Sequence, residues 1–225
     1  MSDFNFMQLL NPEFYILLEF RGIKIGLFVI LFIVFAETGL LAGFFLPGDS
    51  LLFLAGIYSD TLMQQFSTGN SFLDLVVLAC LIAGAGIIGN MFGYWFGHKS
   101  GAYLYKREDN FLFKKKYLYH AKDFFDKYGS KAIIFARFIP IVRTFIPVIA
   151  GIVAMEKKAF MFYNILGSFL WSFVLLFAGH YLHQLFLDKF SIDLKHYIEF
   201  IVIGIILVST IPIFIKILKK SPQRK

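Results

Sequence analysis

Charge is scarce in this sequence of 225 residues, because Asp, Glu, Lys and Arg together make up only 16% of it. Soluble domains carry roughly a quarter of charged residues. By contrast, 58% of this chain is hydrophobic, which leaves too few polar side chains to cover a water-soluble globule. The composition excludes an ordinary soluble domain and indicates an integral membrane protein.

Cysteine is nearly missing as well, and the single Cys80 excludes an internal disulfide. We expect Cys80 to be a small buried side chain, because it lies in an apolar stretch. The sequence also lacks a Gly-rich phosphate loop, a His-Glu-x-x-His motif and a Gly-x-Ser-x-Gly motif. His180 and His183 are three residues apart but have no obvious carboxylate or cysteine partner in their segment. We therefore expect no metal, no cofactor and no enzymatic activity.

The basic residues are not spread evenly. The chain has 22 Lys and Arg against 15 Asp and Glu, a net charge of +7. Nine of the basic residues lie within 99–131 and five within 216–225, whereas 59–71 has none. Basic segments beside apolar spans face the cytoplasm and anionic lipid. This pattern predicts lipid rather than nucleic acid as the partner, with both termini in the cytoplasm.

The apolar runs predict an all-α polytopic membrane protein with about four spanning helices and one membrane domain over 1–225. A spanning helix needs about 20 apolar residues. The first span and a re-entrant hairpin are expected within 25–58, where about 20 residues of the apolar run suffice for the crossing. The other segments are an N-terminal interfacial helix at 1–24, spans at 75–97, 159–187 and 197–216, a cytoplasmic amphipathic segment at 98–131 and a basic tail at 217–225.

Two apolar segments are broken by proline and glycine, and we interpret both as re-entrant hairpins. The first is broken at Pro47 and Gly48, and the second, 132–155, at Pro140, Pro147 and Gly151. Loop charges place them on opposite sides of the membrane. A weak internal likeness supports this arrangement, since Leu-Ala-Gly at 54–56 resembles Ile-Ala-Gly at 149–151. Inverted repeats of this kind place a transport site near the membrane midplane.

Four charged residues fall within segments expected at membrane depth: Glu37, Asp49, Arg137 and Arg143. An ionised side chain costs roughly 2.5–3.5 kcal/mol at the centre of a spanning helix, so these four must pair, protonate or contact water. A structural salt-bridge cluster is one interpretation. We favour a site, because buried ion pairs stabilise less than apolar packing does. Arg137 and Arg143 suit a phosphate headgroup, and Glu37 and Asp49 suit proton or charge coupling.

Small and polar residues surround these charges in the sequence. Small side chains spaced four apart, Ala85, Gly89, Gly93 and Gly97, predict close approach of another helix. Asn90 beside this stripe and Thr144 beside Arg143 are candidates for a polar contact with the substrate. Thr144 is also the only hydroxyl close to the arginines in sequence.

Four motifs together resemble the DedA family of the wider VTT group of membrane proteins. They are Glu37-x-Gly39 leading to Phe45-Leu46-Pro47-Gly48-Asp49; Gly89-Asn90-x-x-Gly93-Tyr94-Trp95-x-Gly97; Phe124-Phe125-x-Lys127-Tyr128-Gly129; and Arg137-Phe138-x-Pro140-x-x-Arg143-x-x-x-Pro147-x-x-Ala150-Gly151. The resemblance implies two re-entrant hairpins that face each other. It also implies movement of a lipid such as undecaprenyl phosphate or a phospholipid, and dependence on the proton-motive force. Asn90 departs from the family, which often has Asp there, and this puts the proton step in question.

We therefore expect a lipid flippase of the bacterial cytoplasmic membrane that moves an anionic lipid phosphate or a phospholipid, with proton coupling as a hypothesis. A proton- or cation-coupled transporter of small solutes is the first alternative. A membrane-embedded lipid-phosphate enzyme and a non-transporting scaffold are further ones. The sequence leaves the lipid, the coupling ion and homo-oligomerisation open.

Overall fold

The computed structural model describes residues 12–20, 22–40, 48–106, 123, 125, 127, 129–137, 140–198, 200, 201 and 204. Over these residues the chain is helical apart from one small β-ribbon. The elements, in chain order, are α1 (Pro12–Ile16), β1 (Glu19–Phe20), β2 (Ile23–Lys24), α2 (Gly26–Gly39), α3 (Gly48–Ile57), α4 (Ser59–Met63), α5 (Ser71–Lys106), α7 (Ala132–Arg137), α8 (Pro140–Ile152), α9 (Lys157–Phe190) and the short 3-10 helix η3 (Leu194–Tyr197).

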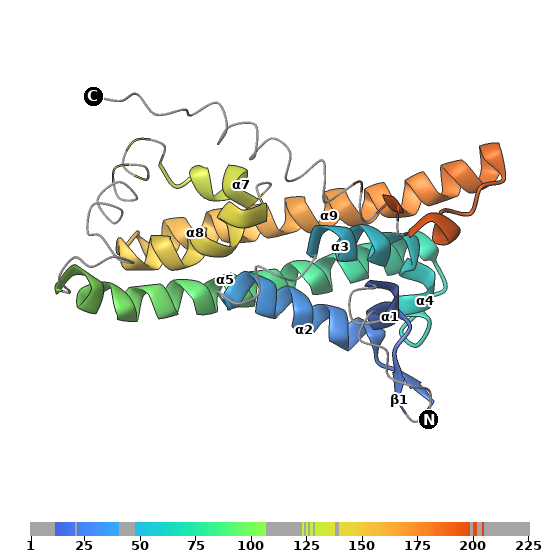
Figure 1. Cartoon of the computed structure of the whole chain (residues 1–225), viewed down its shortest axis with the longest axis horizontal. Helices are drawn as coiled ribbons and strands as arrows, with labels where there is room; N and C mark the ends of the chain where they lie inside the picture. Colours follow the sequence, from blue (N-terminus) through green and yellow to red (C-terminus); the bar gives the residue numbers. More distant parts are fainter. Residues whose placement is uncertain are drawn as a thin grey trace.

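Two long helices, α5 and α9, form the axis of the molecule and lie side by side in opposite directions (Figure 1). They contain 36 and 34 residues, so at about 1.5 Å per residue each exceeds the roughly 30 Å of a bilayer's hydrocarbon. Residues 71–101 of α5 and the whole of α9 are apolar enough to cross a membrane. The predicted spans 75–97 and 159–187 fall within them. Most of the predicted span 197–216 and all of the tail lie outside the described residues.

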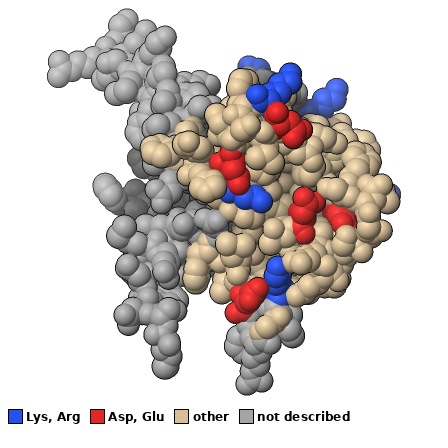
Figure 2. Space-filling model, turned by 90° about the vertical axis from the view of Figure 1, so that its right-hand side faces the viewer, with Lys and Arg blue, Asp and Glu red and all other residues tan. Residues whose placement is uncertain are grey.

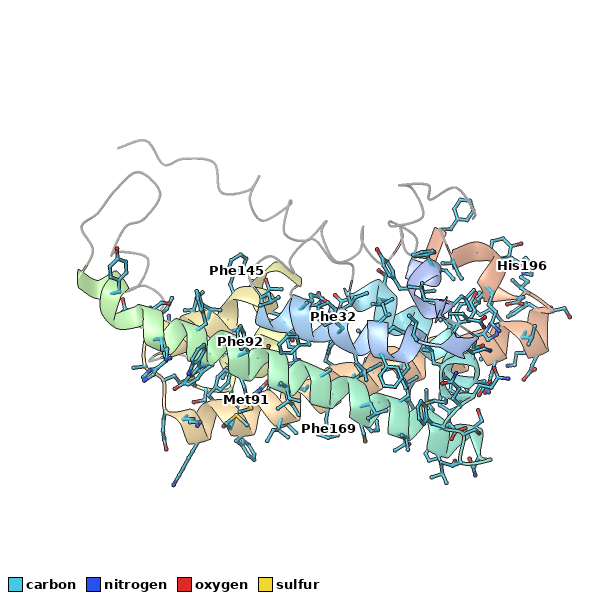
Figure 3. All side chains as sticks on the ribbon, turned by 90° about the horizontal axis from the view of Figure 1, so that it is seen from below. Phe32, Met91, Phe92, Phe145, Phe169 and His196 are labelled. Atoms are coloured by element: carbon cyan, nitrogen blue, oxygen red, sulfur yellow. The ribbon has the colours of Figure 1, made fainter. Side chains whose placement is uncertain are left out.

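The outer faces of these two helices are covered with large apolar side chains. Phe92 on α5 and Phe169 on α9 are exposed (Figure 3), as are Ile88, Phe162 and Leu182. An exposed apolar surface of this size fits contact with lipid rather than with water. Cys80 is also exposed, so the expectation that it is buried is wrong; it lies on the same apolar exterior of α5.

In the segment 25–58 the described residues form two short helices, and the full crossing expected for its first part stays a prediction. Its first helix, α2, begins beside α4, where Phe28 contacts Phe66 and Lys24 contacts Gln64. It ends at Gly39, against Gly89 halfway along α5. The next helix, α3, then returns to the end where α2 began (Figure 1). The described helices have 14 and 10 residues, each less than half of the 36 residues of α5, and the start of α2 lies on the side predicted to be external. The predicted cytoplasmic N-terminus concerns residues outside the described part.

The segment 132–155 divides into α7 and α8, as its prolines predict. The two helices lie at the opposite end of the molecule from α3 (Figure 1). In packing, α2 and α8 lie mainly against α5, whereas α3 and α7 lie mainly against α9. Whether either pair of helices enters a bilayer only part-way stays a prediction.

Other helices approach α5 closely at its predicted small-residue stripe. A Cβ added to Gly89 would lie 2.7 Å from the Phe35 carbonyl oxygen of α2, and one added to Gly97 would lie 2.0 Å from the Val148 carbonyl oxygen of α8. Such contacts require glycine, because any side chain would collide with backbone. The stripe therefore fixes both α2 and α8 on α5.

Two glycine crossings repeat the same geometry at the two ends of the molecule. Where α8 crosses α5, Gly97 faces the carbonyl of Val148, and Gly151 faces the carbonyl of Tyr94. Where α3 crosses α9, Gly179 faces the carbonyl of Phe53, and Gly56 faces the carbonyl of Leu176. In each crossing, a glycine faces the residue three places before the other glycine. The sequence likeness between 54–56 and 149–151 thus corresponds to a repeated packing unit.

The described part of the N-terminal region, from Pro12 on, contains a short helix and a β-ribbon, and the interfacial helix expected at 1–24 stays a prediction. Within 1–24, α1 covers five residues, and Glu19–Phe20 pairs with Ile23–Lys24 as an antiparallel ribbon. Gly22 has a φ of +80°, a conformation that glycine adopts without a steric penalty. Helix α1 ends at Ile16, and the ribbon with its tight turn at Gly22 separates α1 from α2.

Candidate functional site

The central feature of the interior is an ion cluster in which Arg143 pairs with two acids. One terminal nitrogen of Arg143 contacts Glu37 Oε1 and the other contacts Asp49 Oδ1. The three residues come from α8, α2 and α3. Glu37 and Arg143 are buried, at 2% and 6% exposure. One guanidinium therefore joins three helices that are far apart in the sequence.

Local sequence explains how these side chains reach one another. Asp49 lies in the first turn of α3, where the helix dipole favours a negative charge. Arg143 lies in the first turn of α8, which begins at Pro140, the position where proline is best tolerated. Gly48 is required for space, because a Cβ there would lie 1.6 Å from the Glu37 carboxylate.

The other two predicted shaping residues act on α8 itself. Pro147 lies inside α8 and cannot donate a backbone hydrogen bond to Arg143, four residues earlier. Its Cβ lies 3.4 Å from the position a Gly93 Cβ would take, and Gly151 contacts the Tyr94 carbonyl. Both residues therefore fix α8 against α5. Pro47 lies outside the described residues.

Arg137, at the end of α7, lies in a separate amide cluster. Its Nη1 donates to Asn164 Oδ1 of α9 at 3.3 Å, and Asn164 Nδ2 donates to the Ile87 carbonyl at 3.2 Å. The Asn90 amide lies 2.7 Å from Asn164 Oδ1. Turned over, the same amide accepts from Arg137 and donates to the Thr38 carbonyl at 3.2 Å. Asn90 and Asn164 are buried, at 2% and 0% exposure.

One edge of Arg137 is unused. Its Nε and Nη2 have no hydrogen-bond partner within the described part of the chain, although both atoms are buried. These two nitrogens form one side of the planar guanidinium fork, the arrangement that binds two oxygens of a phosphate or carboxylate. Burial without a partner costs about 1–3 kcal/mol for a polar group, and more for a charged one. An anion at this edge would remove that cost.

Trp171 of α9 connects the two arginines. Its ring centroid lies 5.3 Å from the Arg137 guanidinium carbon and 5.0 Å from that of Arg143, within the distance of a cation–π interaction. Its Nε1 donates to Asp49 Oδ1 at 2.8 Å. The two clusters are therefore one continuous polar layer between α5 and α9.

The structure brings together all four predicted charges and Asn90, and Thr144 is buried next to Arg143 in sequence. It does not pair the charges one to one, because Arg143 takes both acids. Sequence reasoning missed Asn164 and Trp171. Each carried a signal: an amide at the middle of an apolar span is costly unless it is bonded, and Trp171 is too far from the ends of α9 to be an interfacial anchor.

Long apolar helices around a buried polar layer define an integral membrane protein. The VTT domain family model matches residues 46–181, a range that includes α3 through most of α9. The chain is 35% identical to Protein DedA of Escherichia coli K12 over 196 residues, which cover 87% of this chain and 84% of that protein. It is 39% identical to an uncharacterised membrane protein of Mycobacterium tuberculosis over 184 residues, covering 81% and 74%. It is also 35% identical to the inner membrane protein YqjA of E. coli K12 over 161 residues, covering 69% and 66%.

The chain therefore belongs to the DedA family of VTT domain membrane proteins. No solved structure gives a significant match.

Proposed function

We propose that the protein is a translocase for a lipid that carries a phosphate, and that it moves the headgroup through the polar layer between α5 and α9. The observation that carries this proposal is the unused edge of buried Arg137, made by Nε and Nη2. A guanidinium edge binds two phosphate oxygens at once. Arg143, already committed to Glu37 and Asp49, then holds the helices rather than the substrate.

This assignment divides the roles that the sequence analysis gave to both arginines together. Arg137 becomes the phosphate ligand, with Asn164 and Asn90 orienting it through the hydrogen bonds described above. Arg143 becomes the ion-pair partner of both acids. When Glu37 or Asp49 takes up a proton, its ion pair with Arg143 is lost. Glu37 and Asp49 thus couple proton uptake to the separation of α2 or α3 from α8.

The charges at the two ends support an orientation in the bilayer. Near the start of α9 and the end of α5, the described basic residues are Lys99, Lys106, Lys127, Lys131, Lys157 and Lys158, against the acids Asp123 and Glu156. At the opposite end, seen in Figure 2, the described acids Glu19, Asp60, Asp74, Asp188 and Asp193 outnumber the lysines Lys24, Lys189 and Lys195. The positive-inside rule then places the Lys157 end in the cytoplasm, and the connection between α4 and α5 outside.

Burial of the polar layer supports a closed state that must open on each side in turn. Arg137, Arg143 and Glu37 are each at most 6% exposed, so a headgroup reaches them only when helices part. The repeated glycine crossings at the two ends provide equivalent contacts for opening inward and outward, as inverted-repeat transporters require.

Reconstitution tests the proposal. Protein in liposomes should move a labelled polyprenyl phosphate or a labelled phosphatidylethanolamine between leaflets, faster than protein-free vesicles do. The Arg137→Lys variant keeps the charge but loses the fork, and it should lose most of this activity. Equal rates for parent, variant and empty vesicles would reject lipid translocation.

The second candidate is a proton- or cation-coupled transporter of a small solute. The Glu37–Arg143–Asp49 cluster favours it, because two acids on one base suit ion exchange without a lipid. Parent vesicles that move protons or cations but leave both labelled lipids in place would support this candidate. We propose no enzymatic role. A lipid-phosphate enzyme and a non-transporting scaffold stay as alternatives. Analysis of the lipids in the same vesicles distinguishes them, because only an enzyme would change the lipid chemically.

A further inference from the structure

A separate cavity of about 840 Å³ lies between α2, α5 and the start of α9. Its wall is largely apolar and aromatic and includes Phe35, Met91, Trp95, Phe160 and Met161. Sites for small molecules enclose about 300–1,000 Å³, so this cavity is large enough for a ligand. Its lining favours hydrocarbon over a polar solute.

The cavity opens toward the lipid-facing exterior. Ile88 and Trp95, which line it, are 60% and 49% exposed. Met91 and Phe92 also line the cavity and are 38% and 41% exposed (Figure 3). Because α5 and α9 are the membrane-crossing helices, a lipid chain can reach this opening sideways without passing through water.

The cavity wall includes two basic residues. Lys157 and His98 are part of its wall, and Lys99 Nζ lies 4.1 Å from the Trp95 ring centroid. The neighbouring acid, Glu156, lines a different hollow with Ser130. Basic groups at one end of an apolar cavity complement an amphiphile with a negative headgroup.

The cavity also lies close to the polar layer. Tyr94 and Phe160 stack at 4.5 Å and form part of the cavity wall. Each is four residues, about 6 Å along a helix, from a member of the amide cluster: Tyr94 from Asn90, and Phe160 from Asn164. A headgroup at Lys157 is therefore near the cytoplasmic approach to Arg137.

We propose that this cavity is the loading site of the translocase, where one hydrocarbon chain of an anionic membrane lipid lies against Met91 and Met161 and its phosphate lies at Lys157. The inference rests on the proposed function, since it names where the substrate waits before the polar layer opens. The loading site lies outside the polar layer. It provides an apolar wall for the hydrocarbon chain and, in Lys157, a ligand for the phosphate.

Photolabelling tests the site. Parent protein in liposomes is exposed to phosphatidylglycerol or phosphatidylcholine that bears a diazirine at the end of one acyl chain. We expect labels on peptides around Met91 and around 157–161, several-fold stronger with phosphatidylglycerol. Labelling spread evenly along the exteriors of α5 and α9, or equal for both lipids, would overturn the proposal.

Matched variants separate the cavity from the exterior next to it. Met161→Trp fills the cavity and should lower labelling several-fold, whereas Phe162→Trp, at an exposed neighbour, should leave it at the parental level. Lys157→Gln should abolish the preference for phosphatidylglycerol, and Lys158→Gln should retain it. Parental labelling in both Met161→Trp and Lys157→Gln would contradict the site.

Measuring both transport and labelling in the parent and the Arg137→Lys variant distinguishes the proposed translocase function from the proposed loading site. Lost transport with parental labelling supports both the loading site and the role of Arg137. Labelling at the cavity without transport by the parent rejects the translocase and leaves a lipid-binding site. Transport by the parent without labelling at the cavity rejects only the loading site.

Discussion

Arg143 and Asp49, each in the first turn of its own short helix, form an ion pair where α8 meets α3. The two helices come from segments with similar Ala-Gly sequences at the two ends of the molecule. Their pairing joins the two broken segments at one point. Glu37 pairs with the same guanidinium. Arg143 therefore holds α2, α3 and α8 together.

We predict that Arg143→Ala destabilises the protein far more than Arg137→Ala does. Removing Arg143 leaves buried Glu37 and partly exposed Asp49 without their base, and breaking a buried ion pair costs about 3–5 kcal/mol. Arg137 contacts amides and an indole instead, so its loss uncovers no ionised partner in the described structure. Thermal unfolding of purified protein in detergent measures the difference, and equal melting temperatures would show that the acids are neutral or solvated.

The glycine crossings predict a second difference in stability. Gly97→Val places a side chain against the Val148 carbonyl, and overpacking of this kind costs about 1–3 kcal/mol or more. Gly84→Val is the matched control on the same helix, because nothing lies within 4 Å of its added Cβ. A melting temperature lowered in the first variant and retained in the second is the expected result. Equal values would mean that α8 is displaced from α5 at little cost.

Translocation should depend on pH through the two acids. Glu37→Gln and Asp49→Asn remove the groups that take up and release a proton beside Arg143. We expect each variant to flatten the pH profile of lipid transport, and the double variant to abolish the dependence between pH 5 and 8. The rates are measured in liposomes at a matched protein content. If both single variants keep the parental profile, the acids have a structural role only.

Asn164 should act as a positioning residue for Arg137. Asn164→Leu removes the acceptor of the Arg137 Nη1 hydrogen bond while keeping a similar volume, and we expect at least a tenfold loss of lipid-phosphate transport. Ser172→Ala, on the same buried face, removes a bond to the Ala79 carbonyl only and serves as the control. If the Asn164→Leu variant folds and transports at the parental rate, Arg137 is held by other contacts.

Cysteine labelling tests the orientation, in a Cys80→Ser background because Cys80 is exposed on α5. Cysteines at Thr68 and Lys24 should react with an impermeant reagent from outside, and one at Lys158 only from inside. Lys24 is the discriminating position, because the contact between Lys24 and Gln64 places it with the α4–α5 connection. Inside labelling at Lys24 would support the full crossing expected for 25–45.

Much of this site is visible in the sequence because a charge in an apolar run is conspicuous. Glu37, Asp49, Arg137 and Arg143 stand out for that reason, and Pro140 and Gly48 mark where helices begin. Pairing is different, since it depends on which helix faces which, and no spacing along the chain reveals that Arg143 takes both acids. Uncharged polar side chains cost less free energy than charged ones at membrane depth, so Asn164 and Trp171 are less conspicuous in the sequence.

The helix ends within 25–58 are hidden in the sequence for a related reason. A run of about 20 apolar residues is sufficient for a crossing, but length does not fix where a helix ends. Glu37 and Asp49 meet their buried partner halfway along α5, so α2 and α3 both end or begin there. Apolar content likewise hides the turn at Gly22, which depends on one positive φ angle.

The way the short helices divide between the two long ones has an electrostatic consequence. The half built on α5, with α2 and α8, contains Glu37 and Arg143, and the half built on α9, with α3 and α7, contains Asp49 and Arg137. With all four ionised, each half carries one positive and one negative buried charge and is neutral by itself. Among these four side chains, only the Arg143–Asp49 ion pair joins the halves. The two halves can therefore separate inside a low-dielectric bilayer without pulling net opposite charges apart, and only one direct ion pair among these four side chains breaks when they do.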